Sequence, residues 1–313
     1  MRDAADLHVP VLLDAVIDLL SPALGRGGIM FDATLGMGGH TEAALNAFSD
    51  ITVIGIDRDP DAIELASKRL APFGERFRAF HGPFDRIVEV ADRYGRPDAI
   101  LMDLGVSSLQ LDEAERGFAY SQDGPLDMRM GQEGESAADL LARVSHAELT
   151  RILKVYGEEK FASRIAAKIL DQDRPGDMST AELAELVRDS IPAPARRTGG
   201  HPAKRTFQAL RIAVNDELGM LERTLPVALD LLRPGGRLVV ESYHSLEDRI
   251  VKSAMVAASS SPTPIDLPVQ PEEPPFRMVT GKATKAHASE VAHNSRSASV
   301  RLRACEKREG LTA

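Results

Sequence analysis

The sequence predicts an α/β fold, a doubly wound and mostly parallel sheet into which an all-helical domain is inserted. Two observations lead to this fold class. Short apolar runs alternate with helical patterns up to about residue 110 and again from residue 218, and buried strands that alternate with helices are typical of a parallel sheet covered on both faces. Between these regions, residues 137–191 have helical periodicity without a strand pattern.

The first half of the sheet is predicted from apolar runs that end at a turn or an acidic residue. The predicted strands are 29–33, 51–56, 77–80 and 99–102. A glycine-rich turn and a helix over 41–48 follow the first strand. Asp57 follows the second strand, and Pro60 then stands in the first turn of a helix, where a residue without an N–H is tolerated.

The middle of the chain is predicted to be helical throughout. Ser145 and Ser179 each precede a glutamate by three residues, which is the capping box that begins a helix. Apolar residues recur at four-residue spacing at 161, 165 and 169. We therefore expect this segment to form a helical insert.

Strand character returns in the last third of the chain. A helix is predicted over 218–232, and Pro234 with two following glycines ends it. The remaining predicted elements are strands over 237–243, 277–280 and 299–303, a helix over 245–258 and a loop over 259–275.

Composition narrows the possible functions. The 313 residues include 38 basic and 47 acidic ones, and the net charge of −9 disfavours a general binder of naked nucleic acid. Cys305 is the single cysteine, which excludes a disulfide framework and a multi-cysteine metal site, and no metal is expected. No apolar segment approaches membrane-spanning length, and the N-terminus is acidic, so we expect a cytoplasmic protein without membrane contact.

A nucleotide-type site is predicted where the first strand ends. The turn Thr34-Leu35-Gly36-Met37-Gly38-Gly39-His40 opens a helix, and glycines there allow a ligand to approach the backbone. Asp57 follows at the spacing where a carboxylate accepts the hydroxyl groups of a ribose. Thr41 stands in place of the third glycine of the dinucleotide fingerprint, which favours S-adenosylmethionine, a cofactor without phosphate, over a nicotinamide dinucleotide. A structural turn beside a surface aspartate is the alternative.

Two further residues are expected at the same edge of the sheet. Asp103 ends the fourth strand, and ligands of open α/β sheets bind beyond the carboxyl ends of the strands. Phe84 follows the third strand, where its ring could face an adenine. The structural alternatives are a turn cap for Asp103 and core packing for Phe84.

Several segments in order along nearly the whole chain resemble one known family. They are Asp57-Arg58-Asp59-Pro60, His81-Gly82-Pro83-Phe84, Asp103-Leu104-Gly105-Val106-Ser107-Ser108, Gln110-Leu111-Asp112, Arg116-Gly117-Phe118, Gly124-Pro125-Leu126-Asp127-Met128-Arg129, Tyr156-Gly157-Glu158-Glu159, His201-Pro202-Ala203-Lys204-Arg205-Thr206-Phe207-Gln208-Ala209 and His244-Ser245-Leu246-Glu247-Asp248-Arg249. They are similar to segments of the bacterial 16S rRNA (cytosine-N4)-methyltransferase family. The chain departs slightly from the family pattern at Leu35, Met37 and Tyr243.

This resemblance implies a seven-stranded class I methyltransferase fold, S-adenosylmethionine as methyl donor and a decoding-centre cytidine of 16S rRNA as acceptor. It implies a discontinuous cofactor-binding domain, 1–110 with 213–313, and an inserted helical domain for RNA recognition, 111–212. The cofactor contacts that it carries over are Gly38, Gly39, His40, Asp57, Phe84, Asp103 and Gln110. The implied partner is 16S rRNA within the assembled small ribosomal subunit, and the oligomeric state stays open.

Asp103 and His244 are the candidate catalytic residues. An oxygen that accepts a hydrogen bond from the cytosine amine would turn the nitrogen lone pair toward the methyl group. Asp103 could orient the amine in this way, contact the cofactor, or do both. His244 is interpreted as a proton acceptor or an RNA contact, with a structural histidine as the alternative.

RNA contact is expected at local basic patches that neutralise phosphates. The candidate RNA-binding residues fall in a stretch without acidic residues and are Arg196, Arg197, Lys204, Arg205 and Arg211. The C-terminal segment 277–309 is also rich in basic residues, and a solvated charged face is the alternative there.

Three other functions agree with parts of the sequence. The glycine turn with Asp57 also suits a nicotinamide-dependent oxidoreductase, and the fold alone would suit a non-catalytic RNA-binding or assembly factor. A DNA methyltransferase is disfavoured, because Asp103 is followed by Leu104-Gly105-Val106 and not by the Pro-Pro-aromatic motif of other amino methyltransferases. The resemblance therefore favours an rRNA N4-methyltransferase over these functions.

Overall fold

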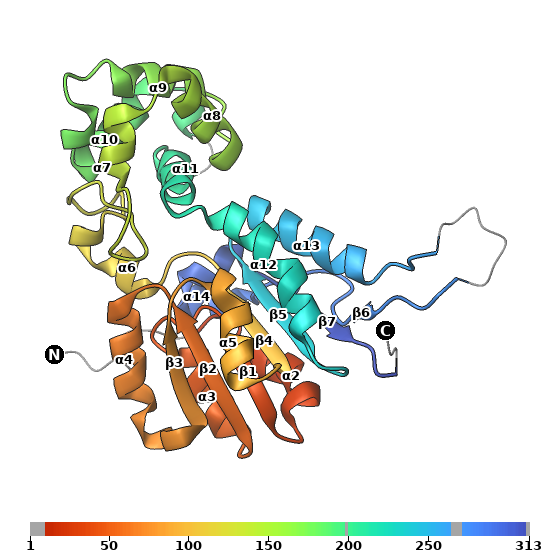
Figure 1. Ribbon diagram of the computed structural model, residues 1–313. Helices are drawn as coiled ribbons and strands as arrows, with labels where there is room; N and C mark the ends of the chain where they lie inside the picture. The colour runs from red at the N-terminus through yellow and green to blue at the C-terminus, as the bar shows by residue number, and fades with distance from the viewer. Residues whose placement is uncertain (1–9, 198–199, 264–270, 311–313) are drawn as a thin grey trace. The chain divides into compact units, whose positions relative to one another are not determined.

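The protein is divided into two compact units. The structure is a computed structural model that describes residues 10–197, 200–263 and 271–310. The first unit comprises Met1–Gly105 with Leu218–Ala313, and the second comprises Val106–Glu217 (Figure 1). The second unit is thus inserted between two consecutive strands of the first.

A seven-stranded sheet forms the centre of the first unit. Its strands are β1 (Gly28–Asp32), β2 (Ile51–Asp57), β3 (Phe77–His81), β4 (Ala99–Asp103), β5 (Arg237–Ser242), β6 (Phe276–Met278) and β7 (Arg301–Lys307). Their order is β3-β2-β1-β4-β5-β7-β6, and only the pairings of β7 with its two neighbours are antiparallel. This doubly wound, mostly parallel sheet confirms the predicted fold class.

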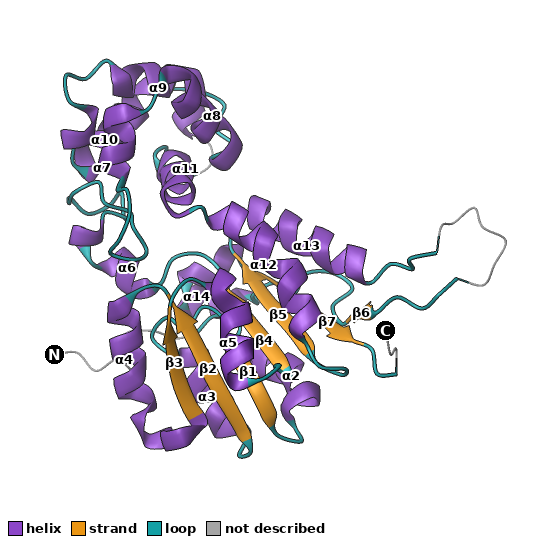
Figure 2. Cartoon of the chain, viewed as in Figure 1, coloured by secondary structure: helices purple, strands orange, loops and turns teal. Residues whose placement is uncertain are grey.

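Alternate residues of the central strands face two separate cores. Phe31 and Val240 pack against α5, α12 and α13, whereas Met30 and Val239 pack against α2, α3 and α4. Helices therefore cover the sheet on both faces (Figure 2). The helices of this unit are α2 (Leu13–Leu24), α3 (Gly39–Ala47), α4 (Pro60–Leu70), α5 (Ile87–Tyr94), α12 (Glu217–Leu231), α13 (Ser245–Ala258) and α14 (Ala288–His293).

The last strands differ in their bounds from the sequence prediction. The prediction of a strand over 299–303 is wrong at its start, because a short 3-10 helix ends at Ser299 and β7 begins only at Arg301. The strand then continues to Lys307, since Leu302 and Ala304 are buried against the sheet while charged residues alternate with them. β6 is likewise shorter than predicted, and residues 264–270 of the predicted loop lie outside the described residues.

The second unit is helical and has its own apolar core. Its helices are α6 (Ser108–Asp112), α7 (Ala137–Arg143), α8 (His146–Tyr156), α9 (Ala162–Leu170), α10 (Thr180–Ser190) and α11 (Lys204–Asn215). Leu149, Ile165 and Leu183 are buried in one cluster that joins these helices. Ser179 and Glu182 form the predicted reciprocal capping box, whereas Ser145 only accepts the hydrogen bond from Glu148 N–H.

None of the helices in the described part of the chain has both the length and the apolar character that crossing a bilayer requires.

Candidate active site

The candidate site lies in the first unit, at the carboxyl ends of β1, β2, β4 and β5. The chain runs outward from β1 to β3 on one side of the sheet and from β4 to β5 on the other. The order therefore reverses between β1 and β4, and open α/β sheets bind their ligands at such a switch point.

Asp57 is fixed by the glycine turn. Gly36 N–H donates to Asp57 Oδ2 at 2.8 Å, and Asp59 N–H donates to Oδ1 at 2.9 Å. Burial raises the pKa of Asp57 to about 6, although these two hydrogen bonds oppose the shift. Each carboxylate oxygen keeps one lone pair for a further donor.

The backbone conformation of this turn favours glycine at two of its positions. Gly36 and Gly38 have φ angles of +51° and +77°, a region that favours glycine. A Cβ at Gly38 would lie 3.0 Å from Leu70 Cδ1 of α4, and one at Gly39 would lie 2.6 Å from Pro10 Cγ. Because Gly38 and Gly39 have no side chain, the start of α3 can pack closely against Leu70 and Pro10.

Asp103 is held at the end of β4 by two neighbouring elements. Tyr243 Oη–H donates to Asp103 Oδ1 at 2.8 Å, and Asp103 N–H donates to Thr34 Oγ1 at 2.6 Å. Burial raises the pKa of the Asp103 carboxyl, while nearby His40 and the Tyr243 hydrogen bond counteract the increase. The side chain remains 22% exposed, so a ligand can reach it.

His40 lies between Asp103 and a buried carboxyl group. Its Nε2 is 3.0 Å from Val11 O and 3.4 Å from Glu241 Oε2, and its Nδ1 is 3.7 Å from Asp103 Oδ2. A carbonyl oxygen can only accept, so Nε2 carries the proton of this hydrogen bond. His40, Asp103 and Glu241 each bring one potential ligand atom within 4.8 Å of the others.

Phe84 and His244 lie at two other strand ends of this unit. Phe84 begins a 3-10 helix after β3, and its half-buried ring packs against the core formed with α5, α12 and α13. His244 is the N-cap of α13: its Nδ1 accepts from Glu247 N–H, and its Nε2 is 3.0 Å from Glu247 Oε1. His244 therefore makes a structural contact, which is the alternative interpretation of this residue from the sequence.

Gln110 belongs to the second unit, where its side chain is buried. Its Oε1 accepts from Ser107 N–H at 3.2 Å, and its Nε2–H donates to Met130 O at 3.3 Å. The same carbonyl accepts from Arg116 Nη2–H. Gln110 is thus attached to the loop that contains the Asp127-Met128-Arg129 segment.

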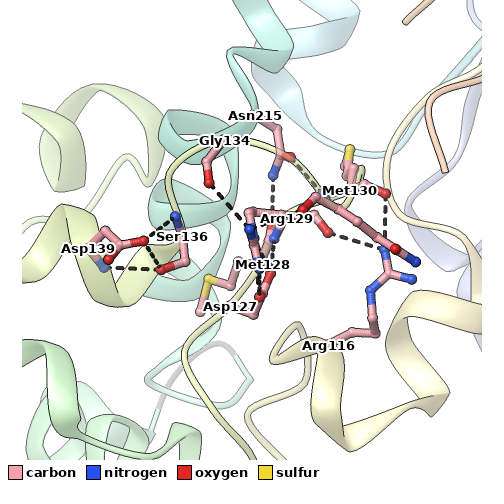
Figure 3. A network of polar contacts seen from close by, with 10 residues as sticks. Arg116, Asp127, Met128, Arg129, Met130, Gly134, Ser136, Asp139 and Asn215 are labelled. Carbon is pink, nitrogen blue, oxygen red and sulfur yellow. Dashed lines mark hydrogen bonds and ion pairs between the residues drawn. The ribbon is translucent and has the colours of Figure 1, made fainter. Parts of the chain in front are cut away.

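Figure 3 shows how this loop is held. Asn215 Oδ1 accepts from Met130 N–H at 2.8 Å, and its Nδ2–H donates to Met128 O at 2.7 Å. Arg129 forms a two-pronged ion pair with Asp127 and also donates to the carbonyl oxygens of Gln132 and Gly134. These contacts hold the buried Met128 at a φ of +60°, which is strained for a residue with a side chain.

The predicted RNA-binding residues differ in how far their charges are available. Lys204 and Arg205 are exposed in the first turn of α11, which has no acidic residue. Arg211 is partly buried and forms a two-pronged ion pair with Glu217, and Arg196 donates to Ile191 O and lies near Asp189. Arg197 lies in a short 3-10 helix.

The C-terminal basic residues are largely engaged within the protein. Arg301 and Arg303 both pair with Asp248, and Arg277 pairs with Glu306. These charges are therefore paired within the protein, and Arg303 is buried with its partner instead of forming part of a solvated face.

The residues at the sheet edge fit S-adenosylmethionine. The Asp57 carboxylate is partly exposed and suited to hydroxyl donors, and a Cβ at Gly36 would meet only Thr34 O, at 4.0 Å, among the described residues. The turn therefore leaves space beside a hydrogen-bond acceptor, as a ribose requires.

Comparisons with known proteins identify relatives of this chain. The model of the MraW methylase family matches residues 5–308. The chain is 57% identical over 307 residues to the Ribosomal RNA small subunit methyltransferase H of Nocardioides sp. (strain ATCC BAA-499 / JS614). This alignment covers 96% of each chain. It is 56% identical over 311 residues to the protein of the same name from Beutenbergia cavernae, covering 97% of this chain and 93% of that one. A putative rRNA-methylase from Clostridium thermocellum aligns over 94% of both chains, with 13% identity and a TM-score of 0.43.

The strand order and the site at its switch point define a class I methyltransferase. Within this class, the chain belongs to the MraW methylase family, whose model covers nearly its whole length. It is an S-adenosylmethionine-dependent methyltransferase.

Sequence reasoning missed part of this site. Glu241 was included in an apolar strand, and so was Asp32, whose buried carboxyl accepts from Thr41 Oγ1–H at 2.6 Å at the end of β1. Tyr243 was noted only as a departure from the family pattern. The available signal was the presence of a carboxylate within each of two otherwise buried strands, because an ionisable group in such a strand needs a partner.

Proposed function

We propose that this methyltransferase methylates the exocyclic N4 of a decoding-centre cytidine in 16S rRNA, acting in the cytoplasm on the assembled small ribosomal subunit. The observation that carries the proposal is the Asp103 carboxylate, which Tyr243 fixes at the edge that also holds Asp57. The names of the similar proteins support rRNA of the small subunit as the acceptor.

The acceptor amine needs help from the protein. The lone pair of a cytosine amino group is delocalised into the ring, so the nitrogen is a poor nucleophile. Asp103 Oδ2 can accept a hydrogen bond from the amine N–H, turn the lone pair out of the ring and take up developing positive charge. S-adenosylmethionine, when bound, supplies the electrophilic methyl group.

The single cysteine is consistent with attack by an amine. Methylation of cytosine at C5 requires a cysteine thiolate that adds to the ring. Cys305 is fully buried in β7, and burial raises the pKa of its thiol to about 12. It is therefore neither ionised nor accessible for such a reaction.

We assign cofactor binding to the first unit and contact with rRNA to the second. The first unit holds the cofactor through Asp57, Asp103 and the glycine turn, and the second contacts rRNA through Lys204 and Arg205. Cations in the first turn of α11 are disfavoured by the helix dipole, which supports a role outside folding for these two side chains.

Nucleoside analysis of methylated subunits tests the proposal. The protein is incubated with radiolabelled S-adenosylmethionine and small subunits that lack the modification, and the rRNA is digested and analysed by mass spectrometry. We expect N4-methylcytidine at one decoding-centre position. If the cofactor binds and no N4-methylcytidine forms, the proposal is wrong.

A further inference from the structure

Three aromatic rings of the second unit contact one another away from the residues assigned so far. The His201 ring lies nearly parallel to the Tyr120 ring, with centroids 4.5 Å apart and planes inclined by 10°. Tyr120 in turn meets the buried ring of Phe207 on α11 edge to face, at 5.8 Å. The three rings therefore lead from the apolar core of this unit to its surface, where His201 is exposed.

The His201 ring presents a flat, fixed surface. Tyr120 covers one face of this ring, which leaves the opposite face and the edge as the exposed part of the side chain. Ala203 N–H donates to His201 Nδ1 at 3.2 Å, and this hydrogen bond fixes the plane of the ring. A ring that is already held in place loses little conformational freedom when a second flat group stacks on it. We call His201 with Tyr120 the aromatic platform.

Two cations follow the platform directly. Lys204 N–H donates to His201 O at 3.1 Å, so α11 begins beside the exposed ring. Lys204 and Arg205 are both exposed, and Arg205 donates to the backbone carbonyl of Glu158, which carries no net charge. Proteins bind unpaired RNA by stacking its bases on aromatic side chains beside cations that contact the phosphates, whereas the bases of a duplex stay stacked within the helix.

We propose that one unpaired base of the rRNA stacks on the exposed face of His201, which Tyr120 supports. Lys204 and Arg205 then contact the phosphates beside this base. The proposal rests on the proposed function, since it concerns the RNA that the second unit contacts. It adds a base contact to the phosphate contacts and gives this unit a preference for single-stranded over duplex RNA.

Substitutions of His201 test the platform. His201→Ala removes the exposed ring, so the affinity of the full-length protein for small subunits that lack the modification should fall about tenfold. The slope of log K against log salt should stay the same, because stacking releases no counterions. His201→Phe keeps a flat ring and should retain most of the wild-type affinity.

His146→Ala is the matched control for these variants. His146 is exposed at the start of α8 in the same unit, and its ring contacts the Ser163 carbonyl oxygen. We expect this variant to bind small subunits as the wild type does. An equal loss of affinity in His146→Ala and His201→Ala would contradict a specific contact at the platform.

Photo-crosslinking identifies the group that lies on the ring. His201 is replaced by 4-benzoylphenylalanine, the protein is irradiated on small subunits, and reverse transcription locates the crosslinked nucleotide. We expect a crosslink to one nucleotide that is unpaired in 16S rRNA. A crosslink to a ribosomal protein or to a nucleotide within a helix would overturn the proposal, and so would the absence of a crosslink from a protein that still binds.

The proposal is also overturned if His201→Ala binds as tightly as the wild type, or if His201→Phe loses as much affinity as His201→Ala. If the alanine variant does not fold, the phenylalanine variant and the crosslink decide the question. Formation of N4-methylcytidine together with binding that is insensitive to His201→Ala would uphold the proposed function and refute the platform. A crosslink to an unpaired nucleotide without any N4-methylcytidine would do the reverse.

Discussion

Three carboxyl groups at one edge of the sheet differ in what holds them, and these differences separate their roles. Asp57 accepts two backbone N–H groups and remains open to a ligand. Asp103 accepts the Tyr243 hydroxyl and is partly exposed, whereas Glu241 is enclosed beside His40. The two accessible groups are suited to ligands, whereas the Glu241 carboxyl is fully buried and out of their reach.

The affinity for S-adenosylmethionine should depend on the ionisation of Asp57. The pKa of this carboxyl is raised to about 6, and a ribose hydroxyl donates to the ionised form. We expect the dissociation constant to rise by about tenfold for each pH unit below 6. Asp57→Asn should weaken binding at pH 7.5 by roughly tenfold to a hundredfold and remove this pH dependence. Calorimetry against pH measures both effects, and a wild-type affinity that is constant from pH 5 to 7 would contradict them.

The same carboxyl should act in the opposite direction on the stability of the free protein. Because its pKa is higher in the folded chain than its ordinary value of 3.8, the folded state binds the proton more tightly. The stabilisation from this proton is complete below about pH 4 and is lost as the pH rises through 6. Asp57→Asn should therefore lose this part of the pH dependence in urea unfolding experiments.

Gly38 combines a left-handed backbone with close packing. Gly38→Ala should destabilise the protein by about 1–3 kcal/mol, because the new Cβ adds contact with Leu70 to the backbone strain. Gly134→Ala is the control, since Gly134 also has a positive φ, and among the described residues no atom lies within 4 Å of an added Cβ there. Thermal unfolding compares the two, and an equal loss in both variants would show that contact with α4 is unimportant.

At the scale of elements, the sequence predicted best where burial dominates the pattern. The central strands β1, β2, β4 and β5 are apolar runs, and they lie close to their predicted positions. Helix α2 was missed because Asp14 and Asp18 interrupt its apolar run, although both lie on its exposed face. The start of β7 was misplaced because Arg301 pairs with Ser242, the last residue of β5, and the local sequence around residue 300 does not show where β5 ends.

Asn215 joins the end of α11 to the loop that contacts Gln110. Asn215→Ala leaves the buried Met130 N–H and Met128 carbonyl without their partner, which should cost about 2–4 kcal/mol. We expect the Met130 amide to exchange its hydrogen at least tenfold faster. Asn215→Asp keeps the acceptor for Met130 N–H and loses the donor to Met128, so its effect should be intermediate. Unchanged exchange in Asn215→Ala would mean that other contacts hold the loop.

The first turn of α11 should contribute to the binding of the small subunit. Replacing both Lys204 and Arg205 by alanine removes two exposed charges, so affinity should fall and the slope of log K against log salt should decrease by about two. The control is the double alanine variant of Arg164 and Lys168, which are exposed on α9 of the same unit. Filter binding at several salt concentrations measures this, and equal losses in both double variants would contradict a specific contact at α11.

For the whole molecule, the sequence predicted which residues lie at the carboxyl ends of the strands. It did not predict the buried side-chain contacts behind those residues. Asp57 and Asp103 follow apolar runs, and a parallel sheet brings such residues to one edge. The approach of His40 to Glu241 joins residues about two hundred positions apart, and the pairings of β1 with β4 and of β4 with β5 bring them together. Spacing along the chain carries no information on such a contact.

The most direct test of the account is a single-turnover measurement of N4-methylcytidine on small subunits, with wild-type protein and Asp103→Ala compared at saturating S-adenosylmethionine. We predict that the wild type forms N4-methylcytidine and that the variant does so about a hundredfold more slowly. Methylation of a different atom, or an Asp103→Ala rate equal to that of wild type, would contradict the account.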